Sequence, residues 1–315
     1  MSAGRIAFLF PGQGSQAVGM GKAFYDTSPA AKAIFEEAND ALGMSLTRLA
    51  FEGPEAELAL TANTQPAVLT ASVAAAAACA ERGLTPALAA GHSLGEYSAL
   101  VVAGALRFAD AVRVVRKRGE FMQEAVPVGT GAMAAVMGLE LPAVEQLCAD
   151  AAQGQVVEVA NINSAGQIVI AGHRTAVERA VALATQGGGK KSVMLPVSAP
   201  FHSSLMAPAA KRLAAELDAA AVASPRFPVA RNLDGALVKT AADVKPSLLG
   251  QVASPVRWTE CVARLSQEGA TAFVEVGPGR VLSGLLRRIL DGVRAQSIED
   301  PDGLDKALTA LGSAG

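Results

Sequence analysis

The sequence predicts an α/β fold in which a parallel sheet is covered by helices and a small ferredoxin-like subdomain is inserted. Through most of the chain, short apolar runs alternate with longer helical patterns, and this alternation indicates parallel strands joined by helices. Residues 129–197 instead follow the order strand, helix, strand, strand, helix, strand, which is the ferredoxin-like βαββαβ arrangement. We therefore expect a large α/β domain at residues 1–128 and 198–315, interrupted by an inserted subdomain at 129–197.

The first part of the chain begins with a buried strand at residues 5–10 that runs into the loop Pro11-Gly12-Gln13-Gly14. Ser28 followed by Pro29 predicts a helix that extends to about Leu42, because proline is favoured at the first helical position. Apolar runs and helical spacing predict the other elements of this part: a helix at 64–82, a strand at 87–91, a helix that ends near Gly104, and a helix at 108–125.

The inserted block contains a turn signal at residues 163–166, Asn-Ser-Ala-Gly, between two apolar runs. The elements predicted around it are strands at 132–137, 156–162, 167–171 and 192–197, and helices at 142–152 and 175–186. Beyond residue 197 the helix and strand alternation resumes. The elements predicted there are helices at 204–220, 243–253 and 258–268, a helix ending near Leu290, and strands at 227–232 and 272–276.

The composition narrows the class of protein. A 51% share of hydrophobic residues can form a large core, and a formal net charge of −2 argues against a nucleic-acid binder. Three widely spaced cysteines fit neither a disulfide framework nor a metal site. The longest notable apolar stretch, Ala71–Ala80, is too short to span a bilayer. We expect a soluble cytoplasmic protein, with no membrane or nucleic-acid partner, and nothing in the sequence demands more than a monomer.

The segment Gly91-His92-Ser93-Leu94-Gly95 follows an apolar run and precedes a helical pattern. In such a Gly-x-Ser-x-Gly pattern the serine lies on a tight turn between strand and helix, and its hydroxyl projects above the sheet. The Leu94 backbone N–H would then point to where an oxyanion forms, near a helix N-terminus that favours negative charge. The pattern predicts a nucleophile at Ser93, although an ordinary turn with a serine cap has the same sequence.

A nucleophilic serine needs a base, and the chain offers only three histidines. The side chain of His92 should diverge from that of its neighbour Ser93 and support the turn. His173 begins a helix of the inserted block, where it should cap the helix or face solvent. His202 lies in the loop that leaves the insertion and is the best candidate, although a plain loop histidine is the alternative. Because no aspartate is clearly placed to orient it, a backbone carbonyl could do so.

Two further residues are candidates for the same site. The loop at Gln13 lacks the spacing of a phosphate-binding motif, and its backbone N–H could serve as an oxyanion donor or belong to a plain turn. The guanidinium of Arg118 could bind a carboxylate through two parallel hydrogen bonds. Arg118 lies on a basic helix, however, and its pattern alone favours a solvated face.

These motifs, in this order, resemble the malonyl-CoA:acyl carrier protein transacylase family of fatty-acid synthesis, over nearly the whole chain. The resemblance rests on Phe10–Gln16, Gly91–Tyr97, Arg118-Gly119, Asn161, Phe201-His202-Ser203, Gln251 and Glu275–Gly279. It implies a hydrolase-like core with the ferredoxin-like insertion. It also implies transfer of malonyl from malonyl-CoA to the phosphopantetheine thiol of acyl carrier protein, through a malonyl-serine intermediate and with no metal or other cofactor.

The resemblance implies roles for the matching residues. Ser93 would be the nucleophile, and His202 would be the general base and later the acid. Gln13 and Leu94 would supply the oxyanion N–H groups, and Arg118 would pair with the free malonyl carboxylate.

Three more residues of the family pattern are expected near the substrate. Gln251 would hold His202, mainly through its main-chain carbonyl. Phe201 fits the malonyl-selective pattern rather than the methylmalonyl one, and Asn161 is expected to contact the substrate. Basic pairs that could meet an acidic carrier or the phosphates of CoA, or simply be scattered solubilising charges, occur at Arg116-Lys117, Lys190-Lys191 and Arg287-Arg288.

Two other functions share part of this pattern. A serine esterase or thioesterase-type hydrolase would have the same serine turn, but it has no use for a carboxylate-binding arginine such as Arg118. A non-catalytic subunit that binds acyl carrier protein could keep the fold, but it would not need both Ser93 and His202.

Overall fold

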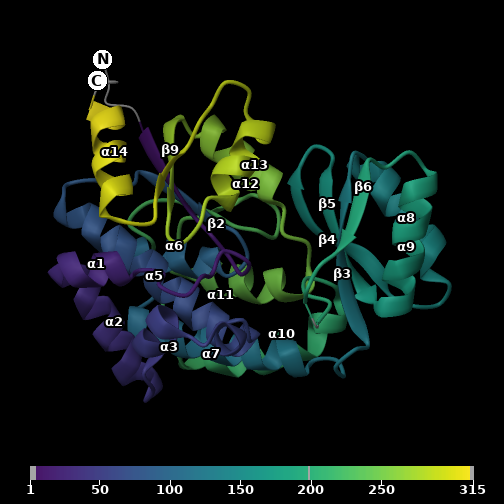
Figure 1. The fold of residues 1–315 in the computed structure, drawn as a ribbon, viewed down its shortest axis with the longest axis horizontal. Coiled ribbons are helices and arrows are strands. Elements are labelled where there is room, and N and C mark those ends of the chain that lie inside the picture. Colours follow the sequence, from purple (N-terminus) through teal and green to yellow (C-terminus); the bar gives the residue numbers. More distant parts are fainter. Residues whose placement is uncertain (1–4, 198, 313–315) are drawn as a thin grey trace.

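The structure is a computed structural model that describes residues 5–197 and 199–312. The expected large domain also includes residues 1–4, 198 and 313–315, which lie outside the described residues. Two sheets organise the described chain, one of six strands and one of four (Figure 1).

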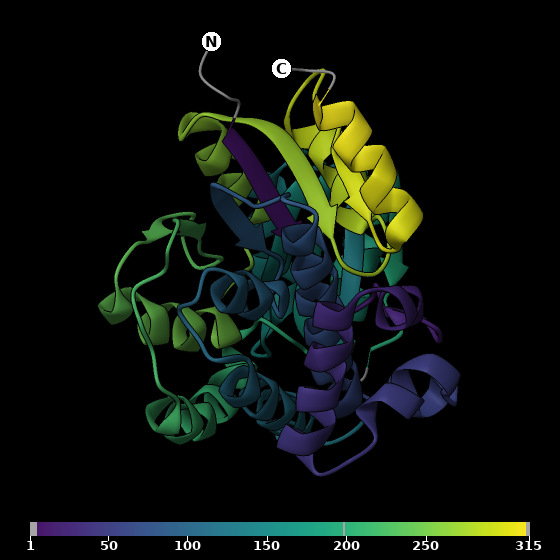
Figure 2. The ribbon, with the colours of Figure 1, turned by 90° about the vertical axis from the view of Figure 1, so that its left-hand side faces the viewer.

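The six-stranded sheet has the order β10-β9-β1-β2-β7-β8, and every neighbouring pair is parallel except β7 and β8. β1 is apolar along nearly its whole length, as expected for a parallel strand covered on both faces. Figure 2 shows it beside β9, although the two strands come from opposite ends of the chain. The strands are β1 (Arg5–Phe10), β2 (Leu88–Gly91), β7 (Val229–Ala230), β8 (Leu237–Val238), β9 (Ala270–Val276) and β10 (Gln296–Ile298).

Helices cover both faces of this sheet, because alternate side chains of β1 enter different apolar clusters. Phe8 and Phe10 join the larger cluster, whereas Ala7 and Leu9 pack with Trp258 in the smaller one. Helices on the face of the larger cluster are α1 (Lys22–Thr27), α2 (Pro29–Leu42), α3 (Leu46–Glu52), α4 (Glu55–Leu58), α5 (Thr61–Glu81), α6 (Gly95–Val102), α7 (Phe108–Glu124), α10 (Ala207–Ala219), α11 (Ala241–Gly250) and α14 (Pro301–Gly312). The opposite face carries α12 (Trp258–Gln267) and α13 (Val281–Ile289).

Local sequence signals set the ends of several helices. α2 begins at Pro29 as predicted, because Ser28 Oγ accepts a hydrogen bond from the Ala31 backbone N–H at 3.0 Å. α5 is rich in alanine and buried around most of its circumference, so α2 and α7 pack closely against it. This packing places the inner face of α7 against the core.

The four-stranded sheet is antiparallel with the order β4-β5-β3-β6, and α8 and α9 share its apolar cluster. This is the ferredoxin-like arrangement, so the predicted fold class is confirmed, while the domain division at residues 129 and 197 stays a prediction. The elements are β3 (Gly131–Met137), α8 (Leu141–Ala152), β4 (Val157–Ser164), β5 (Gln167–His173), α9 (Arg174–Gln186) and β6 (Lys191–Met194).

Several elements differ from the predicted ones. β6 ends at Met194 rather than at residue 197, and Pro196 lacks the N–H that a longer ladder would need. The helix predicted at 204–220 starts as a 3₁₀ turn, Ser204–Met206, and the helix predicted at 243–253 ends as one, Gln251–Ala253. The pattern did not predict α1, α3, α4, α14, β8 and β10, most of which are shorter than eight residues. None of the described helices has both the length and the apolar character needed to cross a bilayer.

Candidate active site

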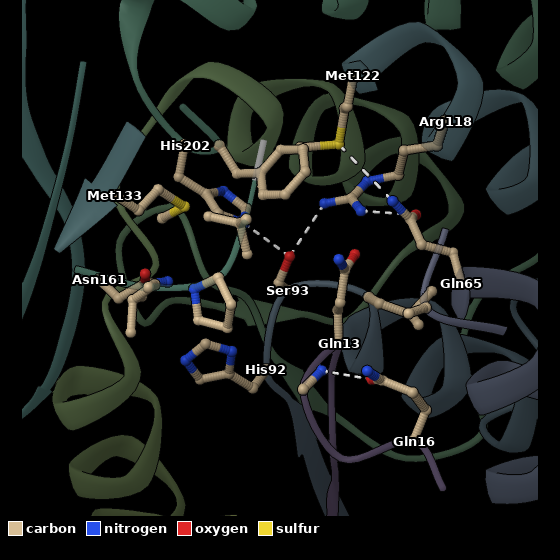
Figure 3. A pocket seen from close by; sticks show the side chains of 17 residues that line it. Gln13, Gln16, Gln65, His92, Ser93, Arg118, Met122, Met133, Asn161 and His202 are labelled. Atoms are coloured by element: carbon tan, nitrogen blue, oxygen red, sulfur yellow. Dashed lines mark hydrogen bonds between the residues drawn. The ribbon is translucent and has the colours of Figure 1, made fainter. Parts of the chain in front are cut away.

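A cavity of about 450 Å³ is lined by residues from both sheet regions (Figure 3). Ser93, Leu94 and Gln13 come from the loops that follow β2 and β1. Met133 lies in β3 and Asn161 in β4, so the second sheet contributes a wall of the same cavity. Because β1 and β2 are parallel neighbours, their carboxyl ends bring the first two loops together.

The turn between β2 and α6 is too tight for larger residues at its two glycines. A Cβ at Gly91 would lie 1.8 Å from the carbonyl carbon of Gly95, and one at Gly95 would lie 2.1 Å from the Phe10 carbonyl oxygen. Ser93 between them has a φ of 52°, in the left-handed region. The turn therefore holds Ser93 in a strained conformation, with its hydroxyl toward the cavity rather than on the helix end as a cap.

The hydroxyl of Ser93 meets His202. Ser93 Oγ lies 2.7 Å from His202 Nε2, and His202 Nδ1 donates to the backbone carbonyl of Gln251 at 2.8 Å. That second bond leaves Nε2 unprotonated and able to accept the serine proton. Burial, reinforced by the nearby Arg118 guanidinium, lowers the pKa of His202 to about 3. The imidazole is therefore neutral at physiological pH, as a general base must be.

Arg118 lies inside the protein, with 2% of its surface exposed, so a solvated helix face is excluded for it. Its guanidinium donates to Gln65 Oε1 and Gln251 Oε1, each at 2.8 Å, and to Ser93 Oγ at 3.1 Å. All three acceptors are neutral, and none of the ion pairs among the described residues includes Arg118. Figure 3 shows Ser93 between His202 and Arg118. The cavity thus presents a cation beside the hydroxyl.

The two expected oxyanion donors also line this cavity. Within residues 5–197 and 199–312, no hydrogen-bond partner is found for the backbone N–H of Gln13 or of Leu94. The Gln13 side chain donates to Thr61 Oγ1 at 3.1 Å, which anchors its loop to α5. The His92 backbone N–H donates to the Phe10 carbonyl at 3.0 Å, which joins the two loops. Both N–H groups are therefore available to an oxygen atom at Ser93.

The remaining predicted residues have different surroundings. Phe201 and Asn161 are buried and line the cavity. The ring of His92 lies away from Ser93 (Figure 3), 2.9 Å from Asn163 Oδ1 through Nε2, and burial lowers its pKa. The prediction that His173 caps a helix or faces solvent is wrong, because its Nδ1 accepts the Val156 backbone N–H at 3.0 Å and ties the start of β4 to the end of β5.

Sequence reasoning missed three polar residues around the site. Gln65 holds Arg118, Asn232 accepts the Ser93 backbone N–H at 2.6 Å, and Glu96 is fully buried in the first turn of α6. A charged residue inside an apolar helix was the available signal for Glu96. Among the described residues no group of three or more metal-ligating side chains is found. The arrangement is suited to attack by a hydroxyl on a carbonyl carbon of a substrate that carries a negative charge.

Comparison with known proteins places these features in a family. A family model described as an acyl transferase domain matches residues 7–301. A relative from Bacillus subtilis (strain 168), named malonyl CoA-acyl carrier protein transacylase, is 49% identical over 308 residues, which are 98% of this chain and 97% of the relative.

Solved structures agree with this comparison. An acyl-carrier-protein S-malonyltransferase from Burkholderia pseudomallei 1710b has a TM-score of 0.94 and 47% identity, covering 97% of this chain and 99% of that one. A malonyl-transacylase in complex with its type II PKS acyl-carrier protein has a TM-score of 0.94 and 45% identity, with the same coverage.

The low pKa of His202 predicts how the reactivity of Ser93 depends on pH. We expect the rate constant for modification of Ser93 by a phosphonofluoridate to change by less than about threefold between pH 8 and pH 5, because His202 stays neutral. A histidine with the usual pKa would be protonated by pH 5 and lose roughly 30-fold. Intact-mass kinetics measure the rate, with Ser93→Ala as the unmodified control. A fall in this rate constant centred near pH 6.5 would contradict the predicted effect of burial on the pKa of His202.

Proposed function

The chain belongs to the acyl transferase domain family, and we propose that it transfers the malonyl group of malonyl-CoA to acyl carrier protein through an ester on Ser93. The resemblance predicted from its motifs is confirmed by the family match. The chain is an acyltransferase. The proposed acyl donor and acceptor follow from the names of the relatives, and the proposed residue roles follow from the site geometry.

One observation carries the choice of acyl group: Arg118 is a buried guanidinium in the same cavity as the Ser93–His202 pair, and it has only neutral partners. In a malonyl thioester, a single methylene separates the carbonyl carbon from the free carboxylate. A substrate held for attack by Ser93 can therefore place its carboxylate on Arg118. An acetyl group would leave the guanidinium without a carboxylate in contact with it, which is a costly mismatch.

The first half-reaction forms the acyl-enzyme. His202 Nε2 accepts the proton of Ser93 as Oγ attacks the thioester carbonyl, and the Gln13 and Leu94 N–H groups stabilise the oxyanion. When this intermediate collapses, the carbon–sulfur bond breaks and the departing CoA sulfur takes the proton from His202. The Gln251 carbonyl holds the imidazole in the tautomer that this cycle needs.

The second half-reaction reverses these steps with another thiol. The phosphopantetheine thiol of the carrier gives its proton to His202 and attacks the malonyl ester, and Ser93 Oγ leaves and recovers the proton. Every proton and bonding pair in this ping-pong cycle is accounted for by the two thiols and the Ser93–His202 pair, so the proposed cycle requires no metal or redox group. Phe201 and Asn161, which line the cavity, are proposed as walls that contact the acyl group and its thioester arm.

We propose a docking rim for the carrier at one end of the four-stranded sheet. In the strand register, Met137 of β3 lies opposite both Lys191 of β6 and Gln167 of β5. The Gln167 side chain also accepts a hydrogen bond from Arg288 of α13. Together with the exposed Lys190, these residues place three basic side chains at that end. A cavity of about 210 Å³ extends from α13 to the Ser93 cavity and shares lining residues with it. Arg116 and Lys117 are paired with Glu120 and are not part of the rim.

The inserted block has a proposed role in the same site. We propose that residues 129–197 act as a subdomain, since one face of their sheet has its own apolar cluster, and that Met133 and Asn161 on β3 and β4 form one wall of the acyl cavity. A cytoplasmic location stays a prediction from the sequence.

Malonyl-CoA should leave a covalent adduct on Ser93. We expect intact-mass measurement to show one added malonyl group on the wild-type protein and none on Ser93→Ala, because only the Ser93 hydroxyl is activated. Subsequent addition of the carrier should remove the adduct and produce malonyl-carrier. Release of free malonate in place of malonyl-carrier would show a hydrolase instead, and no adduct under donor excess would falsify the proposed function.

Removal of the guanidinium should change the acyl preference. In Arg118→Ala we expect the rate of malonyl-adduct formation to fall by roughly 30- to 5,000-fold, as for a buried charge pair worth about 2–5 kcal/mol, while acetyl-adduct formation from acetyl-CoA does not fall. Arg118→Lys keeps the charge without the two-pronged donor and should retain part of the preference. Equal losses for both donors would show that Arg118 does not select the acyl group.

Charge reversal at the rim should weaken the carrier step alone. In Lys190→Glu/Lys191→Glu we expect the KM for the carrier to rise about tenfold at low salt and to depend less on ionic strength, because electrostatic steering of an acidic partner is lost. Adduct formation from malonyl-CoA is the internal control, and Lys22→Glu/Lys306→Glu, on α1 and α14 distant from this sheet in Figure 1, is the matched double charge reversal. An unchanged carrier KM at low salt would rule out this location.

A further inference from the structure

The side chain of Asn232 spans both sides of the serine turn. Its Oδ1 accepts the Ser93 backbone N–H at 2.6 Å, and its Nδ2 donates to the Gly91 carbonyl at 2.7 Å. Asn232 follows β7, whose pairing with β2 ends at Ala90 and Ala230. The side-chain amide therefore continues the hydrogen bonding of β2 beyond the last strand pair, into a turn whose backbone is strained.

Asn232 is itself held by Glu96. Glu96 Oε2 accepts the Asn232 backbone N–H at 2.9 Å, and the same oxygen accepts Gln251 Nε2 at 3.0 Å. Oε1 accepts the Ser247 hydroxyl. All four residues are completely buried, so the carboxyl group depends on these three donors for its polar contacts.

Gln251 extends the contacts of Glu96 to the other side of the site. Its side-chain Oε1 accepts from Arg118 and its backbone carbonyl accepts from His202, both at 2.8 Å. One carboxylate oxygen is therefore linked through Asn232 to the nucleophile and through Gln251 to the base and the guanidinium. These links join α6, the segment after β7, and the end of α11.

We propose that Glu96 is a positioning residue for acyl transfer, because it fixes both Asn232, which holds the Ser93 backbone, and Gln251, which holds Arg118 and His202. The inference rests on the proposed function for its substrates but not for the reactivity of Ser93. The hydrogen bonds from Glu96 form two branches, one through Asn232 and one through Gln251, and the two branches have different consequences. The Asn232 branch sets the attack geometry for every acyl donor, whereas the Gln251 branch also sets the malonyl preference.

The experiment compares Glu96→Leu, Glu96→Gln and Asn232→Leu with the wild type. It measures adduct formation from malonyl-CoA and from acetyl-CoA, and modification of Ser93 by a phosphonofluoridate. A glutamine can accept both N–H groups with its amide oxygen and donate to Ser247 with its amide nitrogen, so Glu96→Gln keeps the whole network. Asn39→Leu is the matched control, because Asn39 also makes two side-chain hydrogen bonds, but to Thr47 in another part of the fold.

In Asn232→Leu we expect all three reactions to slow by about 100-fold, as for a reacting group misplaced by about 1 Å, with the malonyl-to-acetyl ratio unchanged. Glu96→Leu should slow them at least as much and also lower that ratio. Glu96→Gln should restore both quantities to within about threefold of the wild type, and Asn39→Leu should change neither. Thermal unfolding of each variant gives its stability separately.

Wild-type rates in Asn232→Leu, or a Glu96→Gln variant as slow as Glu96→Leu, would overturn the proposal. If Glu96→Leu does not fold, Asn232→Leu and Glu96→Gln decide the question alone, each by comparison with the wild type. If the wild type forms no malonyl adduct, the proposed function fails. The phosphonofluoridate rates then decide this inference, with slow Asn232→Leu and restored Glu96→Gln supporting it and unchanged rates refuting it.

Discussion

The parallel pairing of β1, β2 and β7 brings three loops to one edge of the large sheet, and the site depends on this edge. The loop after β1 carries Gln13, the turn after β2 carries Ser93, and the segment after β7 carries Asn232. These three residues are far apart in sequence, yet each follows the carboxyl end of its own strand, and the three strands are neighbours in the sheet. The tight glycine turn then holds the serine hydroxyl in the cavity to which the second sheet contributes a wall.

At this edge of the sheet, burial controls the charges of the site residues. His202 is kept neutral because burial and Arg118 both disfavour a second positive charge there. Arg118 itself is held by amide and hydroxyl oxygens rather than by a carboxylate, so its charge is still available to a substrate. Burial raises the pKa of Glu96 as well, while its hydrogen bonds act in the opposite direction. The site thus presents one cation and a neutral imidazole beside the Ser93 hydroxyl.

Local signals in the sequence predicted the fold and the pairing of Ser93 with His202. Ser28 and Pro29 identified the start of α2, the glycines around Ser93 identified its turn, and elimination among three histidines identified His202. The burial of Arg118 could not be predicted from its helix, because it depends on packing against α5. Asn232 was missed for the same reason. Its contact with Ser93 joins residues 139 positions apart, and the periodicity of apolar residues along the sequence cannot predict a contact at that separation.

The wall that the second sheet contributes to the cavity has a consequence for how this enzyme can change. The face of that sheet opposite its own apolar cluster lines the cavity through Met133, which packs in the larger cluster, whereas Ser93 and Arg118 belong to the large sheet region and its helices. Among the described residues, no hydrogen bond of the serine turn involves Met133 or Asn161, so we expect their replacement to alter the shape of the cavity and leave the turn in place. We therefore expect mutation of this wall, in evolution or in the laboratory, to widen or narrow the range of accepted acyl groups while Ser93, His202 and Arg118 keep their arrangement.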